Sequence, residues 1–152
     1  MRSFACLFRP APEIDDEGFE RHLWARLQGL HDIDARAGAP WADHVSKDPG
    51  SPHFSMSVAL VAYFVVGLHP GASRAARRFG RPALIFNPHI QFEQLRADGR
   101  YASMQTIIRS REVRAGHGVN PMLSEFGERG EAPQYSGRLV DADWVCPFKA
   151  RS

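Results

Sequence analysis

The stretch FSMSVALVAYFVVGLH, from Phe54 to His69, most constrains the fold because it is dense in β-branched and aromatic residues. Its longest apolar run, Val58 to Leu68, is about half as long as a helix that crosses a bilayer. Residues of these types favour strands. The stretch therefore predicts two strands, at about Phe54–Leu60 and Tyr63–Leu68, that can pair as a hairpin.

An amphipathic helix is predicted before this stretch, within FERHLWARLQGLHDID. Its apolar residues recur three and four positions apart, which places them on one face of a helix. Asp15, Asp16 and Glu17 favour the N-terminal end, where the helix dipole stabilises negative charge. Gly, Pro, Asp and Ser are frequent from Ala37 to Pro52, which predicts a loop. The apolar stripe consists of Phe19, Leu23, Trp24, Leu27, Leu30 and Ile33.

Capping residues divide the segment that follows the hairpin. Ser73 is expected to cap a short helix that runs to Phe79 and ends at Gly80. PALIFN predicts a third strand. Asn87 is a favourable N-cap and Pro88 a favourable first helical residue, so a helix is expected from there to about Ala97.

A second helical segment is expected at Tyr101–Arg111, and the chain after Gly116 has no regular pattern. The order of these elements predicts an α+β fold in which helices cover a small sheet of about three to five strands. Residues 1–152 are the right length for a single domain.

Charge and cysteine content narrow the function classes. The net charge is only +2, but the segment Arg74–Arg114 carries nine arginines against three acids, which favours an anionic ligand. Cys6 and Cys146 lie near opposite ends of the chain and form no disulfide framework. The N-terminal residues are too few and too soon interrupted for a signal peptide. We therefore expect a reduced, cytoplasmic protein that does not enter a membrane.

Two of the seven histidines, His69 and His89, stand beside a proline at the end of a predicted strand. Rigid elements often present functional side chains at such junctions. A helix N-terminus keeps His89 neutral, and neutral imidazole is the form that binds metals. The alternative is that both histidines brace loops. The remaining histidines are expected to be ordinary surface, boundary or loop residues: His22, His31, His44, His53 and His117.

Among metal centres, haem suits this chain better than zinc. A zinc site needs three or four protein ligands, and the spacings HxxxH, HExxH and CxxC are all absent. Haem iron needs only one or two protein ligands. Cys146 is a rival axial ligand. The arginines available to bind the haem propionates in bidentate fashion are Arg74, Arg77, Arg78 and Arg81.

Five motifs in the same order give the chain a family resemblance: FVVGLHPGASRAARRF, ALIFNPHIQFEQLR, VNPMLSEFGE, QYSGR and DWVCPF. Together they resemble the YqcI/YcgG family, which includes the haem-dependent guanidine N-hydroxylases of guanitoxin and D-cycloserine biosynthesis. The motifs extend from about Phe54 to Phe148. The segment before the first helix is shorter than in the family.

The resemblance implies a b-type haem held by histidine. The first-turn position of His89 favours it as the axial ligand, with His69 second. It implies that O2 is used to hydroxylate a guanidino or amino nitrogen of a small arginine-like metabolite. The matching positions are His69, Ser73, Arg74, Asn87, His89, Gln91, Arg96, Asn120, Gln134, Tyr135, Ser136, Arg138 and Trp144.

Candidate roles follow for most of these positions and for a few residues outside the matching set. Gln91, Asn120, Tyr135 and Ser136 are the candidates for contact with substrate or bound oxygen. The candidates for holding a cationic substrate are Glu125, Glu128 and Glu131. The iron and porphyrin would be held by His89, His69, Ser73, Arg74, Arg77 and Arg138.

Several alternatives remain at this stage. The electron donor must be an external partner, because the chain has no GxGxxG fingerprint. A homodimer would help to enclose the cofactor. A non-catalytic haem sensor or carrier would use the same site without turnover. A nucleic-acid module using the arginine-rich segment is less favoured, because the interleaved aromatic residues of such proteins are absent.

Overall fold

The computed structural model describes residues 2–10, 14–114 and 130–151. One antiparallel sheet has the strand order β1-β4-β3-β2, made of β1 (Phe4–Leu7), β2 (Met56–Val58), β3 (Val61–Leu68) and β4 (Ala83–Pro88). The helices are α1 (Asp16–Arg36), α2 (His89–Ala97), α3 (Tyr101–Arg114) and α4 (Ala132–Tyr135). The predicted α+β class is confirmed.

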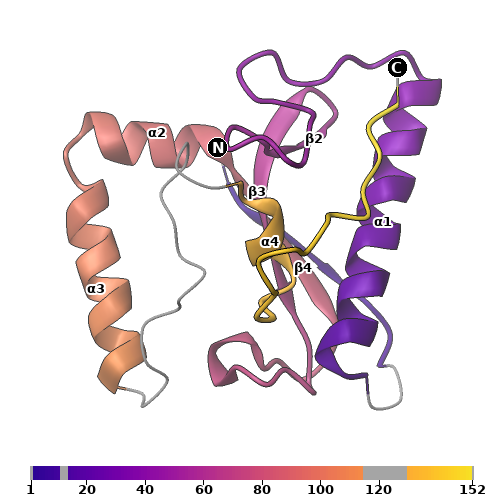
Figure 1. The fold of residues 1–152 in the computed structure, drawn as a ribbon. Helices are drawn as coiled ribbons and strands as arrows, with labels where there is room; N and C mark the ends of the chain where they lie inside the picture. The colour runs from indigo at the N-terminus through magenta and orange to yellow at the C-terminus, as the bar shows by residue number, and fades with distance from the viewer. Residues whose placement is uncertain (1, 11–13, 115–129, 152) are drawn as a thin grey trace.

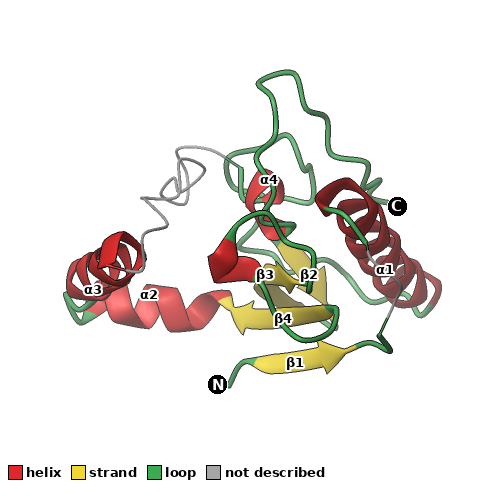
Figure 2. Ribbon diagram, turned by 90° about the horizontal axis from the view of Figure 1, so that it is seen from below, coloured by secondary structure: helices red, strands yellow, loops and turns green. Residues whose placement is uncertain are grey.

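The helices lie in two groups around the sheet. Helix α1 lies along one side, and the C-terminal segment runs beside it (Figure 1). Helices α2 and α3 extend away from the sheet at the opposite side, and Figure 2 shows the same separation from below. No helix within the described ranges is both long and apolar enough to cross a membrane.

The core forms between α1, the sheet and the C-terminal segment. Phe19, Leu23, Trp24 and Leu27 of α1 are at most 3% exposed, as the apolar stripe predicts. Ile33 is 55% exposed, so the buried stripe ends before it and that part of the prediction is wrong. The other large core side chains include Phe54, Met56, Val65, Phe86, Tyr135 and Phe148.

The hairpin is confirmed, with a first strand shorter than predicted. Met56 pairs with Tyr63 and Val58 with Val61, so Ala59 and Leu60 form a two-residue turn with φ of 48° and 68°. Positive φ at both positions is the geometry that matches the twist of a hairpin. The Asp34 carboxylate accepts a hydrogen bond from the Ala59 N–H at 2.7 Å, which holds the turn against α1.

Two predicted caps are absent. Ala75–Arg77 forms only a 3-10 turn, whose N-cap is Arg74, while the Ser73 N–H donates instead to Asp16. Asn87 and Pro88 remain in β4, where they pair with Phe64 and Tyr63 of β3. Pairing with a neighbouring strand therefore outweighs the local capping preference, and the helix begins at His89.

Strand β1 and helix α4 were not predicted from the sequence. β1 lies at the sheet edge and pairs with β4, where Phe4 stacks on Phe86 with ring centroids 4.6 Å apart. α4 is a single turn that places Tyr135 in the core. Both elements are too short for periodicity to identify them.

Gly67 sets the distance between α1 and the sheet. A β-carbon at this position would lie 2.6 Å from the Phe19 ring and 2.8 Å from Leu23. Replacing Gly67 by alanine is expected to destabilise the protein by about 1–3 kcal/mol, because overpacking forces buried neighbours to move. Urea unfolding measures this loss. Gly29→Ala, where an added β-carbon meets nothing within 4 Å, is the control and should not be destabilised.

Candidate functional site

The two candidate iron ligands lie at opposite ends of the sheet. His69 follows β3 at the end where Leu68 pairs with Ala83, and His89 follows β4 at the end where Pro88 pairs with Tyr63. Five residue-to-residue steps along the antiparallel strands separate these pairs, which is about 17 Å at ~3.4 Å per step. One iron therefore cannot bind both histidines, and each must be considered alone.

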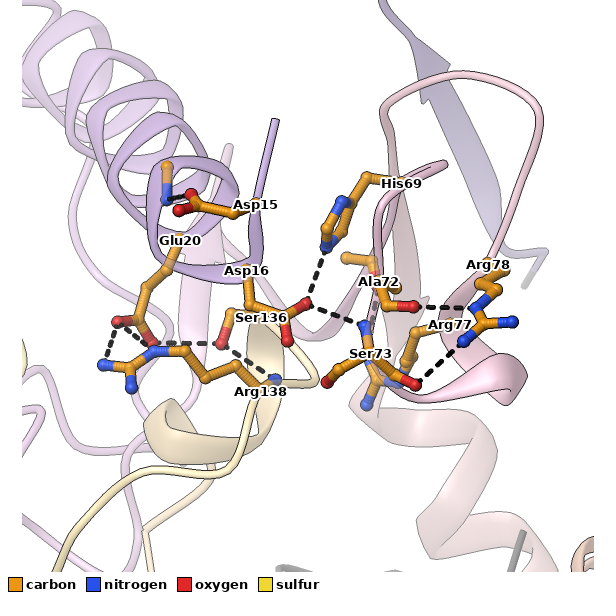
Figure 3. Close-up of polar contacts among 12 residues, drawn as sticks. Asp15, Asp16, Glu20, His69, Ala72, Ser73, Arg77, Arg78, Ser136 and Arg138 are labelled. Atoms are coloured by element: carbon orange, nitrogen blue, oxygen red, sulfur yellow. Dashed lines mark hydrogen bonds and ion pairs between the residues drawn. The ribbon is translucent and has the colours of Figure 1, made fainter. Parts of the chain in front are cut away.

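His69 is fully buried between the start of α1 and the loop after β3. Its ring stacks on Phe19 with centroids 4.3 Å apart, and its Nε2 lies 3.1 Å from Asp16 Oδ1. The same Asp16 oxygen accepts the Ser73 N–H at 3.2 Å, so one carboxylate ties α1 to this loop (Figure 3). His69 Nδ1 is buried with no hydrogen-bond partner among the described residues.

Asp16 is held in its charged form. Burial raises the pKa of its carboxyl, but hydrogen bonds from Ser73 and His69 oppose this and bring the pKa below its ordinary value. An anionic Asp16 accepts hydrogen bonds from both partners. His69 thus has the contacts of a buried structural brace.

The arginines near His69 are occupied by backbone oxygens. The Arg77 guanidinium donates to the carbonyls of Gly67, Gln134 and Tyr135. That of Arg78 donates to the carbonyls of the loop at residues 72 and 73 (Figure 3). These side chains fasten the loop and α4 to β3, so their role in binding propionates stays a prediction.

A second carboxylate joins α1 to the C-terminal segment. Glu20 accepts hydrogen bonds from Arg138 at 2.8 Å and 3.1 Å, and from the Ser136 hydroxyl at 3.0 Å (Figure 3). The Trp144 ring N–H lies 3.4 Å from the same carboxylate. Glu20 is only 8% exposed. Glu20 is not among the predicted site residues, and its carboxylate brings the side chains of Ser136, Arg138 and Trp144 together.

His89 belongs to a different buried chain of polar groups. Its Nε2 lies 2.6 Å from Glu131 Oε1, and the Tyr135 hydroxyl lies 3.2 Å from Glu131 Oε2. The hydroxyl also accepts the Met56 N–H at 3.0 Å. His89, Glu131 and Tyr135 are at most 5% exposed. The Met56 backbone of β2 thus positions Tyr135, Tyr135 positions the Glu131 carboxylate, and Glu131 positions the His89 imidazole.

Tyr135 stays protonated in this arrangement. Burial and the neighbouring Glu131 carboxylate raise the pKa of Tyr135 well above its ordinary value. The phenol therefore has a proton to donate, either to Glu131 or to the Tyr63 carbonyl at 3.2 Å. Both Glu131 oxygens are engaged within the protein, which leaves this carboxylate poorly suited to hold a cationic substrate.

The remaining predicted site residues are not gathered at His89. Gln91 is half-buried on α2, while Ser73 and Arg74 lie in the loop beside His69. Asn120, Glu125 and Glu128 fall outside the described residues. Of the substrate-contact candidates, Tyr135 contacts Glu131, the partner of His89.

Cys146 is unsuited to thiolate chemistry. Burial raises the pKa of its thiol to about 12, so roughly one thiol in 10⁴ would be ionised at pH 8. We expect iodoacetamide to leave Cys146 unmodified in the folded protein at this pH and to alkylate it once urea unfolds the chain. Peptide mass spectrometry reads out the modification. Rapid alkylation of folded protein would contradict the buried, protonated thiol.

The donor chemistry at His89 would allow one bond to haem iron through Nδ1, because Nε2 is engaged with Glu131. A neutral imidazole that donates Nε2–H to Glu131 carries its lone pair on the other ring nitrogen. Metal-binding histidines commonly donate their second ring N–H to a carboxylate. In the described part of the chain no group of three or more His, Cys, Asp or Glu could hold a bare metal ion. The arginines expected at the propionates lie beside His69, so this part of the predicted haem site does not assemble around His89.

Comparison with known proteins identifies one relationship. The family model described as the YqcI/YcgG family matches residues 1–149, almost the whole chain. No curated protein and no solved structure matches the chain.

Proposed function

The chain belongs to the YqcI/YcgG family, and from this premise we propose that it is a haem protein whose iron is bound by His89. We propose further that it uses O2 and an external electron donor to hydroxylate a guanidino or amino nitrogen of a small arginine-like metabolite. The buried His89–Glu131–Tyr135 chain is the observation that supports the first part. The resemblance of the motifs to guanidine N-hydroxylases supports the second.

His89 has the properties that an axial ligand needs. The ring is almost fully buried, and the 2.6 Å contact with Glu131 fixes both its tautomer and its orientation. His69 also pairs with a carboxylate, but its ring is enclosed by Phe19 and by the loop that Asp16 holds.

His89, Glu131 and Tyr135 each have a defined task in this proposal. Haem would supply the redox chemistry that transfers one oxygen atom from O2 to a nitrogen, while two electrons from the external donor and two protons reduce the other atom to water. Glu131 accepts the His89 Nε2–H, which increases the basicity of Nδ1, the nitrogen that would bind the iron. The Tyr135 hydroxyl holds the second oxygen of Glu131, and the Met56 backbone holds Tyr135.

Glu131 is a positioning residue in this account. Glu131→Gln keeps an acceptor for His89 but removes the negative charge, so we expect haem affinity to fall about 10–100-fold. Titration of the Soret band measures the affinity, and the iron reduction potential should rise because a neutral partner stabilises the oxidised iron less. Glu93→Gln, an exposed acid on α2, should change neither quantity. Equal effects of the two substitutions would contradict the role of Glu131.

Turnover separates the hydroxylase from a haem sensor or carrier. Haem-loaded protein, a reductase with NADH and ¹⁸O₂ are incubated with arginine and a panel of guanidino and amino compounds. If the protein is a hydroxylase, we expect the wild type to form a product carrying one ¹⁸O atom and His89→Gln to form none. A haem-loaded protein that converts none of these compounds would overturn hydroxylation while leaving haem binding to be judged by its own spectrum.

A further inference from the structure

A cavity lies between two loops, and none of His89, Glu131 and Tyr135 lines it. It has a volume of about 680 Å³ and is lined by residues 47–50, which follow α1, by Gly130 and Pro133, and by residues 144–146 and 148–150 of the C-terminal segment. Neither His69 nor His89 lines it. Its size is in the range of small-molecule sites.

Both lysines of the chain line this cavity. Seventeen of the nineteen basic residues are arginine, and the only two lysines, Lys47 and Lys149, face the same space. Both residues are exposed. Neither side-chain ammonium group makes a hydrogen bond or ion pair with another described residue. Two positive charges without an ion-pair partner among the described residues thus lie at the edge of one cavity.

One acidic side chain shares the cavity with the lysines. Asp48 lines it, but its Oδ1 already accepts the Gly50 N–H at 2.9 Å within its own turn. The Lys149 ammonium also lowers the pKa of the Cys146 thiol, against the larger rise that burial causes. The charge that the lining residues present is therefore positive on balance.

The walls of the cavity are apolar and held in place. Trp144, Val145 and Phe148 line it, and Val145 is 76% exposed. The contact of the Trp144 ring N–H with Glu20 fixes one edge of the indole, and Phe148 packs in the core. A flat apolar body can therefore lie against a wall that exists before the ligand arrives.

We propose that this cavity binds a small aromatic carboxylate, with its anionic group between Lys47 and Lys149 and its ring against Trp144 and Val145. Two point charges suit a carboxylate, because no arginine among the described residues lines the cavity to form the bidentate contacts typical of phosphate sites. Anchoring by a few polar groups over an apolar wall is typical of small-molecule sites. This proposal is independent of haem and of the chemistry at His89.

Calorimetric titration with 2-naphthoate tests the site, with 2-naphthamide as the neutral probe of the same shape. We expect the naphthoate to bind several-fold and at most ~30-fold more tightly than the amide, since exposed ion pairs to two lysines add only a modest amount of binding free energy. The double variant Lys47→Gln, Lys149→Gln should abolish this preference. Both lysines are exposed, so the variant is expected to fold.

A second cavity supplies the matched control. It has a volume of about 450 Å³ and is lined by apolar side chains together with Arg9, His22 and Arg26. The double variant Arg9→Gln, Arg26→Gln should leave naphthoate binding unchanged. The proposal is overturned if naphthoate does not bind at millimolar concentration, if the amide binds equally well, or if the arginine variant rather than the lysine variant loses binding.

Discussion

Replacing Glu20 by alanine is expected to destabilise the protein by about 3 kcal/mol, since removing one partner of a buried ion pair leaves the other uncompensated. Glu20 accepts hydrogen bonds from Arg138, Ser136 and the Trp144 ring. Without the carboxylate, these donors of the C-terminal segment face the apolar surface of α1. Equilibrium unfolding in urea, followed by circular dichroism, measures the loss of free energy.

Two arginines give a matched comparison for this prediction. Arg138 pairs with Glu20 at 2.8 Å with 21% of its side chain exposed, whereas Arg151 pairs with Asp32 at 2.8 Å with 65% exposed. Arg138→Gln should therefore destabilise the protein far more than Arg151→Gln, because water screens the exposed pair. Similar losses for the two variants would show that the Glu20 contacts do not hold the C-terminal segment.

The second large effect is expected at His69. His69→Ala should destabilise the protein by about 3 kcal/mol, because it removes a fully buried ring that stacks on Phe19 and leaves Asp16 without one of its donors. Urea unfolding measures this effect too. His69→Gln keeps a donor within reach of Asp16 and should retain part of the lost free energy. A His69→Ala variant as stable as the wild type would contradict the structural role.

Much of the fold follows from periodicity in the sequence. The apolar spacing identifies α1, and the β-branched run identifies β2 and β3. β1 escapes prediction because it is a four-residue edge strand with three exposed side chains. The cap expected at Asn87 fails for a related reason. Pairing with β3, which is distant in sequence, overrides a preference that depends only on neighbouring residues.

The separation of His69 and His89 has a topological cause. Both residues follow strands, and in a parallel sheet the ends of successive strands would meet at one edge. β3 and β4 are antiparallel neighbours, so their C-terminal ends point in opposite directions. Local sequence identifies strands more readily than it identifies their direction. The predicted grouping of both histidines with one arginine cluster therefore does not occur.

The spacing of Glu20 and His31 in the sequence indicates that both side chains are buried. They stand three residues before Leu23 and four after Leu27, so both lie on the buried stripe of α1. A polar residue inside an apolar stripe needs a buried partner. Glu20 finds Arg138, and His31 Nε2 accepts the Arg151 N–H at 2.8 Å. The identity of these partners depends on the path of the C-terminal segment, which periodicity does not give.

Haem titration of two matched variants tests the central claim most directly. His89→Gln and His69→Gln each keep a donor for the neighbouring carboxylate, so each preserves the local fold while removing one imidazole. We predict that the wild type and His69→Gln bind one haem per chain with the same Soret band, and that His89→Gln loses this band. Loss of the band in His69→Gln alone, or a wild-type protein that remains colourless with haem, would contradict the assignment of His89 as the iron ligand.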